Sequence, residues 1–547
     1  MTALLTDNLP LLAGAPNGTK KLRELILELA VRGKLVPQDP NDEPASELLK
    51  RIAEEKARLV SEGKVRKQKP LAEIGAEEKP FDVPTNWEWV RVAAVGHDWG
   101  QKTPDKAFTY IDVGAVDNAA GRISAPQVLM AEDAPSRARK VVRPGTVIYS
   151  TIRPYLLNVA VIEEAYEQEP IASTAFAIIH PYLEMPARYF LCYLRSPVFV
   201  RYVESVQMGI AYPAINDGQF FSGLIPLPPL AEQHRIVAKV DELMALCDRL
   251  EARQADADSA HAQLVQALLG SLTQASDAAD FAQSWQRLAE HFHTLFTTES
   301  SIDALKQTLL QLAVMGKLVP QDPNDEPASE LLKRIADAKE QAASQGRVRK
   351  VKTATDYRAS DTEVTVPAGW SLSTVGEVTI CRDGERIPVS QAEREGRAKT
   401  YDYYGASGVI DKIDGYLFDK PLLLVGEDGA NLINRSTPIA FMARGKYWVN
   451  NHAHVLDGVS EALLLYVQLY FNAIDLKPYV TGTAQPKMNQ AKMNSIVLLL
   501  PPEAEQHRIV AKVDQLMALC DQLKARLNQA RQVHEHLASA LVEQAVA

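Results

Sequence analysis

The sequence is poor in cysteine, in long hydrophobic runs and in net positive charge. Its four cysteines form no CxxC pair, the spacing with which many zinc sites and dithiol redox motifs begin. No window approaches the roughly 18 uninterrupted apolar residues that cross a membrane. The first residues, MTALLTDNLPLLAG, lack the basic segment of an export signal. We therefore expect a cytoplasmic protein with reduced cysteines.

The net charge of −10 limits which ligands the chain could bind without help. A protein that neutralises DNA phosphates is normally basic. The segment 84–226, the first insert, contains 12 basic and 14 acidic residues. The segment 366–500, the second insert, contains 13 basic and 14 acidic residues. If the chain binds DNA, we expect it to use local clusters of basic residues, with a partner protein supplying further positive charge.

Motifs for nucleotide, cofactor and metal chemistry are also missing. The sequence contains no GxxxxGK[ST] phosphate loop and no glycine-rich turn that would hold a dinucleotide. The Asn/Asp-Pro-Pro-aromatic tetrad of adenine methylases is absent. The pairs HFH at 291–293 and HAH at 452–454 lack companion ligands at zinc-site spacing. We predict no catalytic residue and no metal site in this chain.

What the sequence does contain is a long internal repeat. Residues 33–53, GKLVPQDPNDEPASELLKRIA, return unchanged at 316–336. AEQHRIVAKVD occurs at 231–241 and again at 504–514. Between the identical blocks the sequences diverge almost completely. A duplicated frame that carries two unlike inserts indicates a recognition protein with two different reading surfaces.

Each insert ends at a Pro-Pro hinge that is followed by a long predicted helix. From the hinge onward, apolar residues recur with alternating spacings of four and three, which favours coiled-coil packing. About 35 residues would form a rod of roughly 50 Å, and antiparallel pairing of two rods would place one insert at each end. The residues assigned to this spacer are Ile236, Val240, Leu243 and Leu250, and in the second copy Ile509, Val513, Leu516 and Leu523.

The same seam continues through a histidine in both copies. It reaches His261 and Leu264 in the first helix, and His534 and Leu537 in the second. A polar seam residue can fix the register of a coiled coil, and a histidine can also ligate a metal. We favour the first interpretation.

Two charged segments of the repeat are open to two interpretations. The acidic QDPNDEPASE could suggest a nuclease, but its duplication between helices indicates a structural turn. The basic strips GKVRKQK at 63–69 and GRVRKVK at 346–352 fit either a solvated linker or contacts with DNA phosphates.

The two inserts follow one pattern of predicted elements. The first has strand-like segments at 147–152, 158–162 and 173–179 and a helix at 186–207, and the second has a similar series that ends in a helix near 462–471. Trp87 and Trp370 occupy equivalent positions at the start of each insert, where we expect them to anchor it to the frame. We predict that both inserts are α+β domains with a common fold and different surfaces.

Sequence-specific reading of DNA requires forked donors and acceptors that match base edges. In the first insert the candidates are Arg137, Arg139, Lys140, Arg143, Arg153, Tyr155, Tyr212 and Asn216. In the second insert they are Arg382, Arg386, Arg394, Arg397, Lys399, Asn431, Asn434, Arg435, Gln485, Lys487 and Asn489. A single residue of these types is more often an ordinary surface residue. Their clustering in corresponding loops of both inserts favours DNA contact.

The hinges PLPPLAEQHRIVAKVD and LLPPEAEQHRIV, on a frame with two inserts, resemble the specificity (S) subunit of type I restriction–modification enzymes. The resemblance implies that each insert is a target-recognition domain that binds one half of a gapped, asymmetric DNA target. It also implies that the paired helices set the gap and dock two methyltransferase (M) subunits. The chain itself would be non-catalytic and bind no cofactor, while S-adenosylmethionine, ATP and Mg would belong to the M and restriction (R) subunits.

The expected fold is α+β, with two globular target-recognition domains separated by two long antiparallel coiled-coil helices and an internal pseudo-twofold repeat. Its regions would be an N-terminal helical arm (1–70), the first domain (71–226), a central helical region that repeats the arm (227–353), the second domain (354–499) and a C-terminal helix (500–547). We expect the arm to pack beside the C-terminal helix. A protein-interaction scaffold and an enzyme with an unrecognised site are the alternatives.

Overall fold

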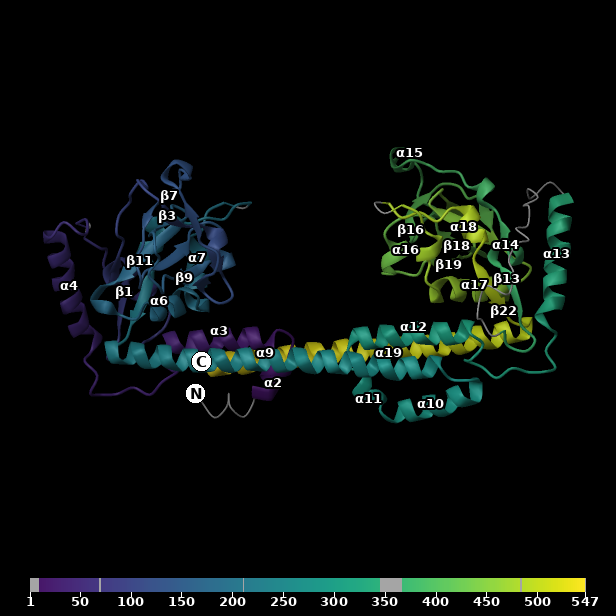
Figure 1. Cartoon of the computed structure of the whole chain (residues 1–547), viewed down its shortest axis with the longest axis horizontal. Coiled ribbons are helices and arrows are strands. Elements are labelled where there is room, and N and C mark those ends of the chain that lie inside the picture. Colours follow the sequence, from purple (N-terminus) through teal and green to yellow (C-terminus); the bar gives the residue numbers. More distant parts are fainter. Residues whose placement is uncertain (1–8, 68–69, 210, 345–365, 483–484, 547) are drawn as a thin grey trace. The chain divides into compact units, whose positions relative to one another are not determined.

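The structure is a computed structural model of the chain that describes residues 9–67, 70–209, 211–344, 366–482 and 485–546. The second basic strip, 346–352, and the end of the first, 68–69, lie outside the described residues. The chain divides into two compact units, Met1–Asp256 with Ala530–Ala547, and Ala257–Gln529. Each unit contains one globular α+β domain and several helices of the repeat (Figure 1).

Helices of the repeat frame begin each unit. The first unit has α2 (Leu9–Gly14), α3 (Gly18–Val31) and α4 (Ala45–Ser61), and the second has α10 (Ala278–Glu290), α11 (Phe292–Leu295), α12 (Glu299–Val314) and α13 (Ala328–Ser344). Two helices of 44 residues each belong to both units. The chain passes from the first unit to the second in α9 (Leu230–Thr273) and from the second to the first in α19 (Glu503–Val546).

The globular domain of the first unit is built on two larger sheets, with a two-stranded sheet where its ends meet. The antiparallel pair β1 (Glu88–Arg91) and β12 (Leu224–Leu227) joins its two ends, next to the short α5 (Val92–Val95). One sheet has the order β6 (Gln127–Leu129), β3 (Phe108–Ile111), β10 (Glu169–Ser173), β7 (Ala138–Val141). The other has the order β2 (Gly96–His97), β11 (Phe176–Pro181), β8 (Val147–Ser150), β9 (Val159–Val161), β5 (Arg122–Ile123), β4 (Val116–Asp117). The helices are α6 (Ala187–Leu194), α7 (Pro197–Val206) and α8 (Asp217–Ser222).

The globular domain of the second unit has the same plan. Its ends are joined by β13 (Ser371–Thr374) and β22 (Val497–Leu500), next to α14 (Val375–Val378). One sheet has the order β16 (Gly408–Ile413), β15 (Tyr401–Gly405), β20 (Lys446–Val449), β17 (Phe418–Asp419). The other has the order β14 (Ile380–Cys381), β21 (Ala453–Asp457), β18 (Leu422–Gly426), β19 (Ala440–Ala443). The helices are α15 (Gln391–Glu395), α16 (Asn431–Asn434), α17 (Glu461–Ala473) and α18 (Gln490–Asn494).

Corresponding strands pair in the same way in both domains. In the sheet β6-β3-β10-β7 of the first domain the two central strands, β3 and β10, are parallel, as are the two central strands, β15 and β20, of the sheet β16-β15-β20-β17 in the second. The central strands β8 and β18 both pair antiparallel with the long strands β11 and β21. These central strands, VIYS and LLLVG, are buried along their whole length and rich in β-branched, aromatic and leucine residues. The prediction that the inserts share an α+β fold is confirmed.

The repeated hinge sequence fixes each domain to its own part of the frame. In the first unit the indole nitrogen of Trp87 donates a hydrogen bond of 2.9 Å to Glu232. The guanidinium of Arg235 binds both oxygens of Asp42, at 3.1 and 2.5 Å. These contacts confirm that Trp87 anchors the insert and that the acidic turn is structural.

The same contacts recur in the second unit. Trp370 donates a hydrogen bond of 2.9 Å to Glu505, and Arg508 binds Asp325 at 3.3 and 2.5 Å. One contact differs between the copies. Gln38 donates to the second oxygen of Glu232 at 2.6 Å, whereas the equivalent oxygen of Glu505 is buried without a hydrogen-bond partner.

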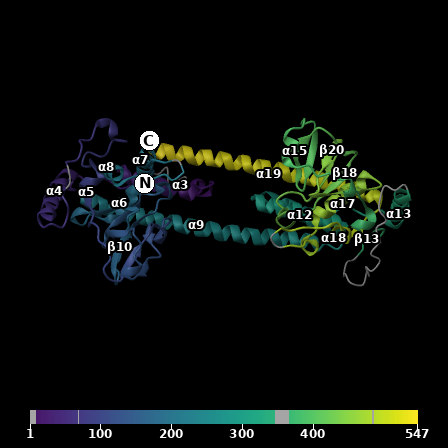
Figure 2. The same ribbon diagram turned by 90° about the horizontal axis from the view of Figure 1, so that it is seen from above.

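Within the first unit, α3 lies between α9 and the last turns of α19 (Figure 2). Arg23 of α3 binds Asp248 of α9 at 2.6 Å. On the other side, Lys21 donates to Ser539 of α19 at 2.9 Å, and Lys34 donates to the carbonyl of Val546 at 2.8 Å. The prediction that the N-terminal arm packs beside the C-terminal helix is confirmed.

In the second unit, α12 has the equivalent position between α19 and the last turns of α9. Lys306 and Asp303 of α12 form ion pairs with Asp521 and Lys524 of α19. Lys317, the repeat of Lys34, donates to the carbonyl of Thr273 at the end of α9, at 2.8 Å. In each unit a short repeat helix therefore occupies part of the seam that the sequence assigned to direct pairing of the long helices.

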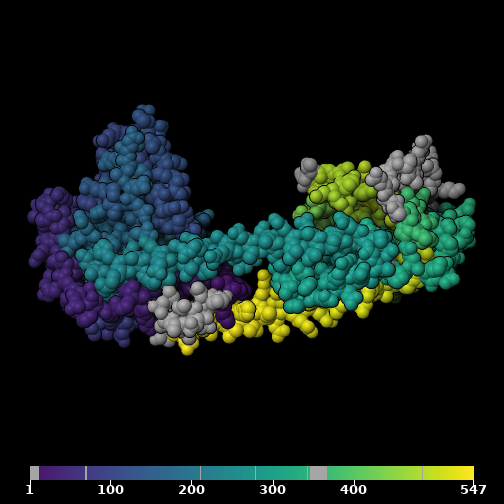
Figure 3. Space-filling model, turned by 60° about the horizontal axis from the view of Figure 1, so that its bottom comes forward, coloured from purple at the N-terminus to yellow at the C-terminus, as the bar shows by residue number. Residues whose placement is uncertain are grey.

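The eight spacer residues follow this arrangement. Ile236, Val240 and Leu243 are buried in the first unit, as are Ile509, Val513 and Leu516 in the second, while Leu250 and Leu523 are partly buried. Further along α9, residues 251–260 are exposed (Figure 3).

The prediction of a seam that stays buried beyond this point is wrong. Leu264 and Leu537 are 51% and 47% exposed, and the buried residues are their neighbours Val265 and Ala538. The reason is that a straight α-helix drifts by about 20° per heptad relative to a strict seven-residue repeat. After four heptads the apolar stripe has moved by almost one residue.

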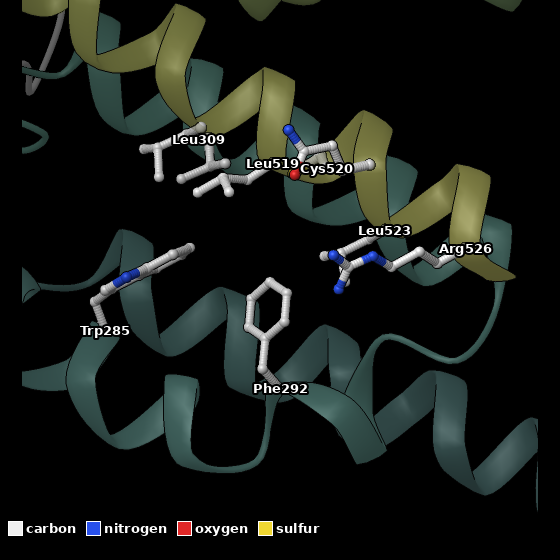
Figure 4. A pocket seen from close by; sticks show the side chains of 9 residues that line it. Trp285, Phe292, Leu309, Leu519, Cys520, Leu523 and Arg526 are labelled. Atoms are coloured by element: carbon white, nitrogen blue, oxygen red, sulfur yellow. The ribbon is translucent and has the colours of Figure 1, made fainter.

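An apolar cavity of about 300 Å³ lies in the second unit between α19 and the α10–α11 segment (Figure 4). Trp285 and Phe292 form one wall, and Leu516, Leu519 and Leu523 of α19 are among the residues that form the rest. The side chain of Arg526 is its one charged lining group.

Candidate nucleic-acid interface

Each domain presents two adjacent loops beside the end of its central strand. In the first domain, loop A is 151–157, after β8, and loop B is 207–216, before α8. In the second domain, loop A is 427–435, after β18, and loop B is 481–489, before α18. Residues 210, 483 and 484 of the B loops are outside the described residues. We call each pair of loops the two-loop platform of its domain.

Backbone hydrogen bonds hold the first platform together. Ile152 and Met208 both form bridges with Ala214. The amide of Arg153 donates to the carbonyl of Pro213 at 2.8 Å, and the amide of Ile215 donates to Thr151 at 2.9 Å.

The second platform repeats these bonds at equivalent positions. Asp428 and Thr481 form bridges with Lys487. The amide of Gly429 donates to Pro486 at 3.0 Å, and the amide of Met488 donates to Glu427 at 2.8 Å. The two platforms are therefore the same structure, formed by sequences that share little more than one glycine, one proline and one asparagine in loop B.

Those few shared residues have structural reasons. Gly209 and Gly482 have φ values of 91° and 85°, a region that L side chains rarely adopt. The shared prolines are Pro213 and Pro486, whose carbonyls accept the loop A amides described above. The shared asparagines each cap the helix that follows. Asn216 accepts a hydrogen bond from the amide of Gln219, and Asn489 accepts one from Lys492, both at 2.9 Å.

Each loop A also contains a left-handed residue that is not glycine. Arg153 and Leu157, with φ of 48° and 52°, enclose one 3₁₀ turn, Pro154–Leu156. Arg435, with φ of 54°, ends α16 in the second domain. Such residues cost on the order of 1–3 kcal/mol and persist only where the surroundings hold them. Here the bonds between loops A and B hold the first platform in shape.

The two platforms differ in chemistry. On the first, five large apolar side chains project into solvent: Ile152 (41% exposed), Tyr155 (50%), Leu156 (41%), Met208 (60%) and Tyr212 (71%). The guanidinium of Arg153 lies 5.1 Å from the centre of the Tyr212 ring. A cation stacked on an aromatic ring is held in place without an acidic partner.

The second platform is polar. Lys487 forms an ion pair of 3.2 Å with Glu427, which in turn binds Arg386 at 2.9 Å. Asp428 binds His452 at 2.7 Å. These contacts link loop A to loop B, to Arg386 and to His452, which directly precedes β21.

A buried histidine supports this polar platform from below. The side chain of His454 is 1% exposed, and its Nδ1 lies 2.6 Å from Asp383 while its Nε2 lies 2.8 Å from the carbonyl of Met488. The ring therefore connects Asp383 to Met488, which belongs to loop B. Burial would raise the pKa of Asp383, but the hydrogen bond and charge of His454 outweigh it and hold that pKa below its ordinary value.

Of the residues predicted in the first domain, four lie on the platform and one lies beside it. Arg153, Tyr155 and Tyr212 are on the platform, as is Asn216, whose side chain caps α8. Arg137 is exposed, and its carbonyl accepts a hydrogen bond from the amide of Thr174. The next residue, Ala175, accepts a hydrogen bond from the amide of Thr151 in loop A.

The other predicted residues of the first domain have different surroundings. Arg143 precedes β8 at the end opposite to loop A, and its guanidinium stacks 3.9 Å from the centre of the Trp99 ring. Lys140 is 8% exposed and forms an ion pair of 2.9 Å with Asp217. Arg139 is half-buried. These contacts give Lys140 a structural role in place of the exposed one that the sequence suggested.

In the second domain, Asn434, Gln485 and Lys487 are exposed on the platform. Asn431 is turned inward, where its side chain binds the backbone of Thr437. Arg435 donates to the carbonyls of Phe471 and Ile474 at the end of α17, at 3.1 and 2.5 Å. Burial lowers the pKa of its guanidinium.

Asn489 caps α18, and the remaining candidates of the second domain are held in ion pairs. Their partners are Glu385 for Arg382, Glu427 for Arg386, Asp411 for Arg394 and Lys399, and Asp414 for Arg397. Arg382, Arg386 and Arg394 have largely covered side chains and serve the fold. DNA contact by the exposed candidates stays a prediction.

Sequence reasoning missed the apolar members of the first platform. Ile152, Leu156 and Met208 carry no hydrogen-bonding group, so a search for base-edge readers passes over them. Their signal was the IRPYLL sequence, where large apolar residues surround a proline between two strands. Asp383 and His454 were also missed, because their contact joins residues that are far apart in the sequence.

In the described part of the chain, no group of three or more His, Cys, Asp or Glu side chains could hold a metal ion. Among the described helices, none is both long enough and apolar enough to cross a membrane.

Comparison with known proteins finds close relatives. Residues 84–257 and 367–531 match the type I restriction modification DNA specificity domain. The sequence is 36% identical to the type I restriction enzyme EcoAI specificity subunit of Escherichia coli, over 97% of this chain and 94% of that protein. Its identity to the EcoEI specificity subunit of Escherichia coli is also 36%, with the same coverage.

The fold has a counterpart among solved structures. A chain from a study of complex assembly and conformational transition of the type I R-M system superposes with a TM-score of 0.52 at 22% identity. The match covers 85% of this chain and 99% of that one. It supports the architecture of two domains on long helices.

Proposed function

Since the chain belongs to the type I restriction–modification DNA specificity family, we propose that its two-loop platforms are the surfaces that read DNA. Specificity subunits are the non-catalytic, DNA-recognition components of these systems. Each platform would contact one half of a gapped, asymmetric target.

One observation carries this proposal above the others. The platforms occupy equivalent positions and share a hydrogen-bonded backbone, yet one exposes apolar and aromatic side chains and the other exposes charges and amides. A conserved support with variable chemistry is what two readers of different sequences require. A protein-interaction scaffold has no need of such matched loops.

The partners follow from the same family. We propose that the chain works in the cytoplasm with two methyltransferase subunits and with restriction subunits. These partners would bind S-adenosylmethionine, ATP and Mg, and they would supply the positive charge that a chain with a net charge of −10 lacks. The long helices α9 and α19 would set the length of the gap.

Footprinting tests the proposal. The target is first identified by sequencing the methylated bases of the source organism. The chain, assembled with its methyltransferase subunits, should then protect two short tracts on that target, separated by an unprotected gap of fixed length. One continuous tract, or no protection, would contradict the assignment of two separate readers.

A pair of arginine variants tests the position of the first reader. Arg153→Ala should weaken binding by roughly 5- to 150-fold, equal to about 1–3 kcal/mol for one base contact. Base changes in one half of the target should then matter less. Arg143→Ala, at the opposite end of β8, is the matched control and should bind like the original protein. Equal losses in both variants would show that the first platform is not the reader.

A further inference from the structure

The first platform has more exposed apolar surface than sequence reading by hydrogen bonds requires. It exposes five large, mainly apolar side chains and one cation, Arg153, which is already stacked on Tyr212. On the second platform, Ile433 is the one large apolar side chain that is exposed among the described residues, at 36%. Contiguous apolar surface of this kind normally marks a contact site.

The exposed residues are presented on a rigid support. Pro154 is buried at the base of the turn, and the left-handed residues Arg153 and Leu157 enclose it. Asn118 donates a hydrogen bond of 3.0 Å to the carbonyl of Leu156. Tyr155 and Leu156 therefore project from a turn that cannot easily fold back onto the domain.

Duplex DNA offers few apolar surfaces to such a turn. Phosphates and sugar oxygens need donors, and base edges need donors or acceptors. The apolar surfaces are the methyl groups of thymine and the faces of the bases, and the faces become accessible only when a base step is opened. Proteins that open a step insert apolar side chains, such as phenylalanine, leucine or methionine, between neighbouring base pairs.

We propose that Tyr155 and Leu156 form a wedge that enters the duplex at the half-site read by the first domain. The step that it opens would be a flexible pyrimidine–purine step, because such steps unstack most easily. Tyr212 and Met208 flank the wedge and cover the bases on either side. The inference rests on the proposed function. It adds that one half-site is read partly through its deformability, and the other through hydrogen bonds and charge.

The experiment uses the complex of the chain with its methyltransferase subunits, bound to duplexes that carry 2-aminopurine at successive positions of each half-site. The methylated adenines are left unlabelled, because methyltransferases take their target base out of the stack. Unstacking of 2-aminopurine raises its fluorescence. The expected result is a rise at one step in the half-site of the first domain and none in the other half-site. The double variant Y155A/L156A should lose that rise and bind roughly 5- to 150-fold more weakly, as expected for the loss of one stacked base.

Three controls make the outcome decisive. Y155F/L156M keeps the apolar bulk and should keep the signal, so its loss in this variant would overturn the wedge. Met130→Ala removes an exposed apolar residue elsewhere in the same domain, 55% exposed, and should change nothing. Thermal unfolding of each variant identifies a folding defect. If Y155A/L156A is defective, the signal of the conservative variant Y155F/L156M decides whether the wedge exists.

The wedge and the proposed function fail in different ways. If the original complex protects both half-sites and no 2-aminopurine position brightens, the wedge is wrong and DNA reading stands. If neither half-site is protected, the proposed function itself fails.

Discussion

Loop A begins with Thr151 in the first domain and with Glu427 in the second. The hydroxyl of Thr151 donates to the carbonyl of Ala175 at 2.8 Å, a local bond between neutral groups. The carboxylate of Glu427 binds Arg386 and Lys487. Burial would raise its pKa, but hydrogen bonds and charges that include those of these cations outweigh burial and hold the pKa below the ordinary value. Equivalent backbones are thus supported by neutral packing in one domain and by buried charge in the other.

This difference separates the support of a reading surface from its chemistry. Backbone bonds between loops A and B are the same in both domains, and so are the Trp–Glu and Arg–Asp contacts of the hinge with the frame. Side chains on the platform can then change without altering how the loops are held. The platform of the second domain is more sensitive to substitution, because it depends on buried ion pairs in which both partners must be present.

Of the substitutions proposed for the second domain, removal of Asp383 should destabilise it most. Asp383→Ala would remove the nearer of the two carboxylates of the buried His454 and leave Arg386 with Glu427 alone, and loss of one partner of a buried pair costs about 3–5 kcal/mol. We expect the unfolding transition of the second domain to move to lower temperature by roughly 10 °C. Circular dichroism during heating measures this change.

A surface carboxylate gives the matched control. Asp419 lies 4.0 Å from Lys446, and both side chains are about half exposed. Asp419→Ala should leave the transition where it is, because exposed pairs contribute little. Similar shifts in the two variants would mean that the buried network is not what supports the second domain.

The two copies of the hinge differ in a way that pH should reveal. Burial raises the pKa of Glu505 to about 7, and the hydrogen bond from Trp370 only partly opposes it. Burial also raises the pKa of Glu232, but there Gln38 and Trp87 both donate to the carboxylate. The identical residue therefore binds its proton in two different environments.

The sign of the effect follows from linkage. A carboxyl group with a raised pKa in the folded chain stabilises the fold below its ordinary pKa of 4.5, and this contribution is lost as the pH rises through about 7. The loss between about pH 5 and about pH 8 should be on the order of 3 kcal/mol. In Glu505→Gln this part of the pH dependence should vanish, whereas Glu232→Gln should alter it less. Chemical denaturation across that range checks both, and identical profiles would contradict the difference.

Much of the frame could be predicted because its signals are local or repeated. Identical blocks marked the repeat, and Trp87 and Trp370 marked the start of each insert. The strand VIYS was visible in its composition. The predicted helix at 186–207 is broken into α6 and α7, because Ser196 caps a new helix whose first residue is Pro197.

Other features could not be predicted because they depend on distant partners. The parallel pair β3–β10 joins segments about 60 residues apart, so neither strand shows its neighbour in the sequence. Lys140 and Arg386 resemble surface residues until Asp217 and Glu427 are brought beside them. Of the five exposed side chains on the first platform, only Tyr155 and Tyr212 were predicted, since aliphatic residues in a sequence are normally assigned to the core.

The smallest expected effect separates two arginines that the sequence could not distinguish. Arg435 caps the carbonyl end of α17 with two hydrogen bonds, so Arg435→Ala should destabilise the second domain by about 1–2 kcal/mol. The Arg153 guanidinium stacks on Tyr212 and makes no hydrogen bond among the described residues. Arg153→Ala should therefore leave thermal unfolding unchanged while it weakens DNA binding. Heating curves of the two variants, recorded with DNA-binding curves of the assembled complex, make the test. A destabilised Arg153→Ala would show that the first platform uses its cation for support, as the second does.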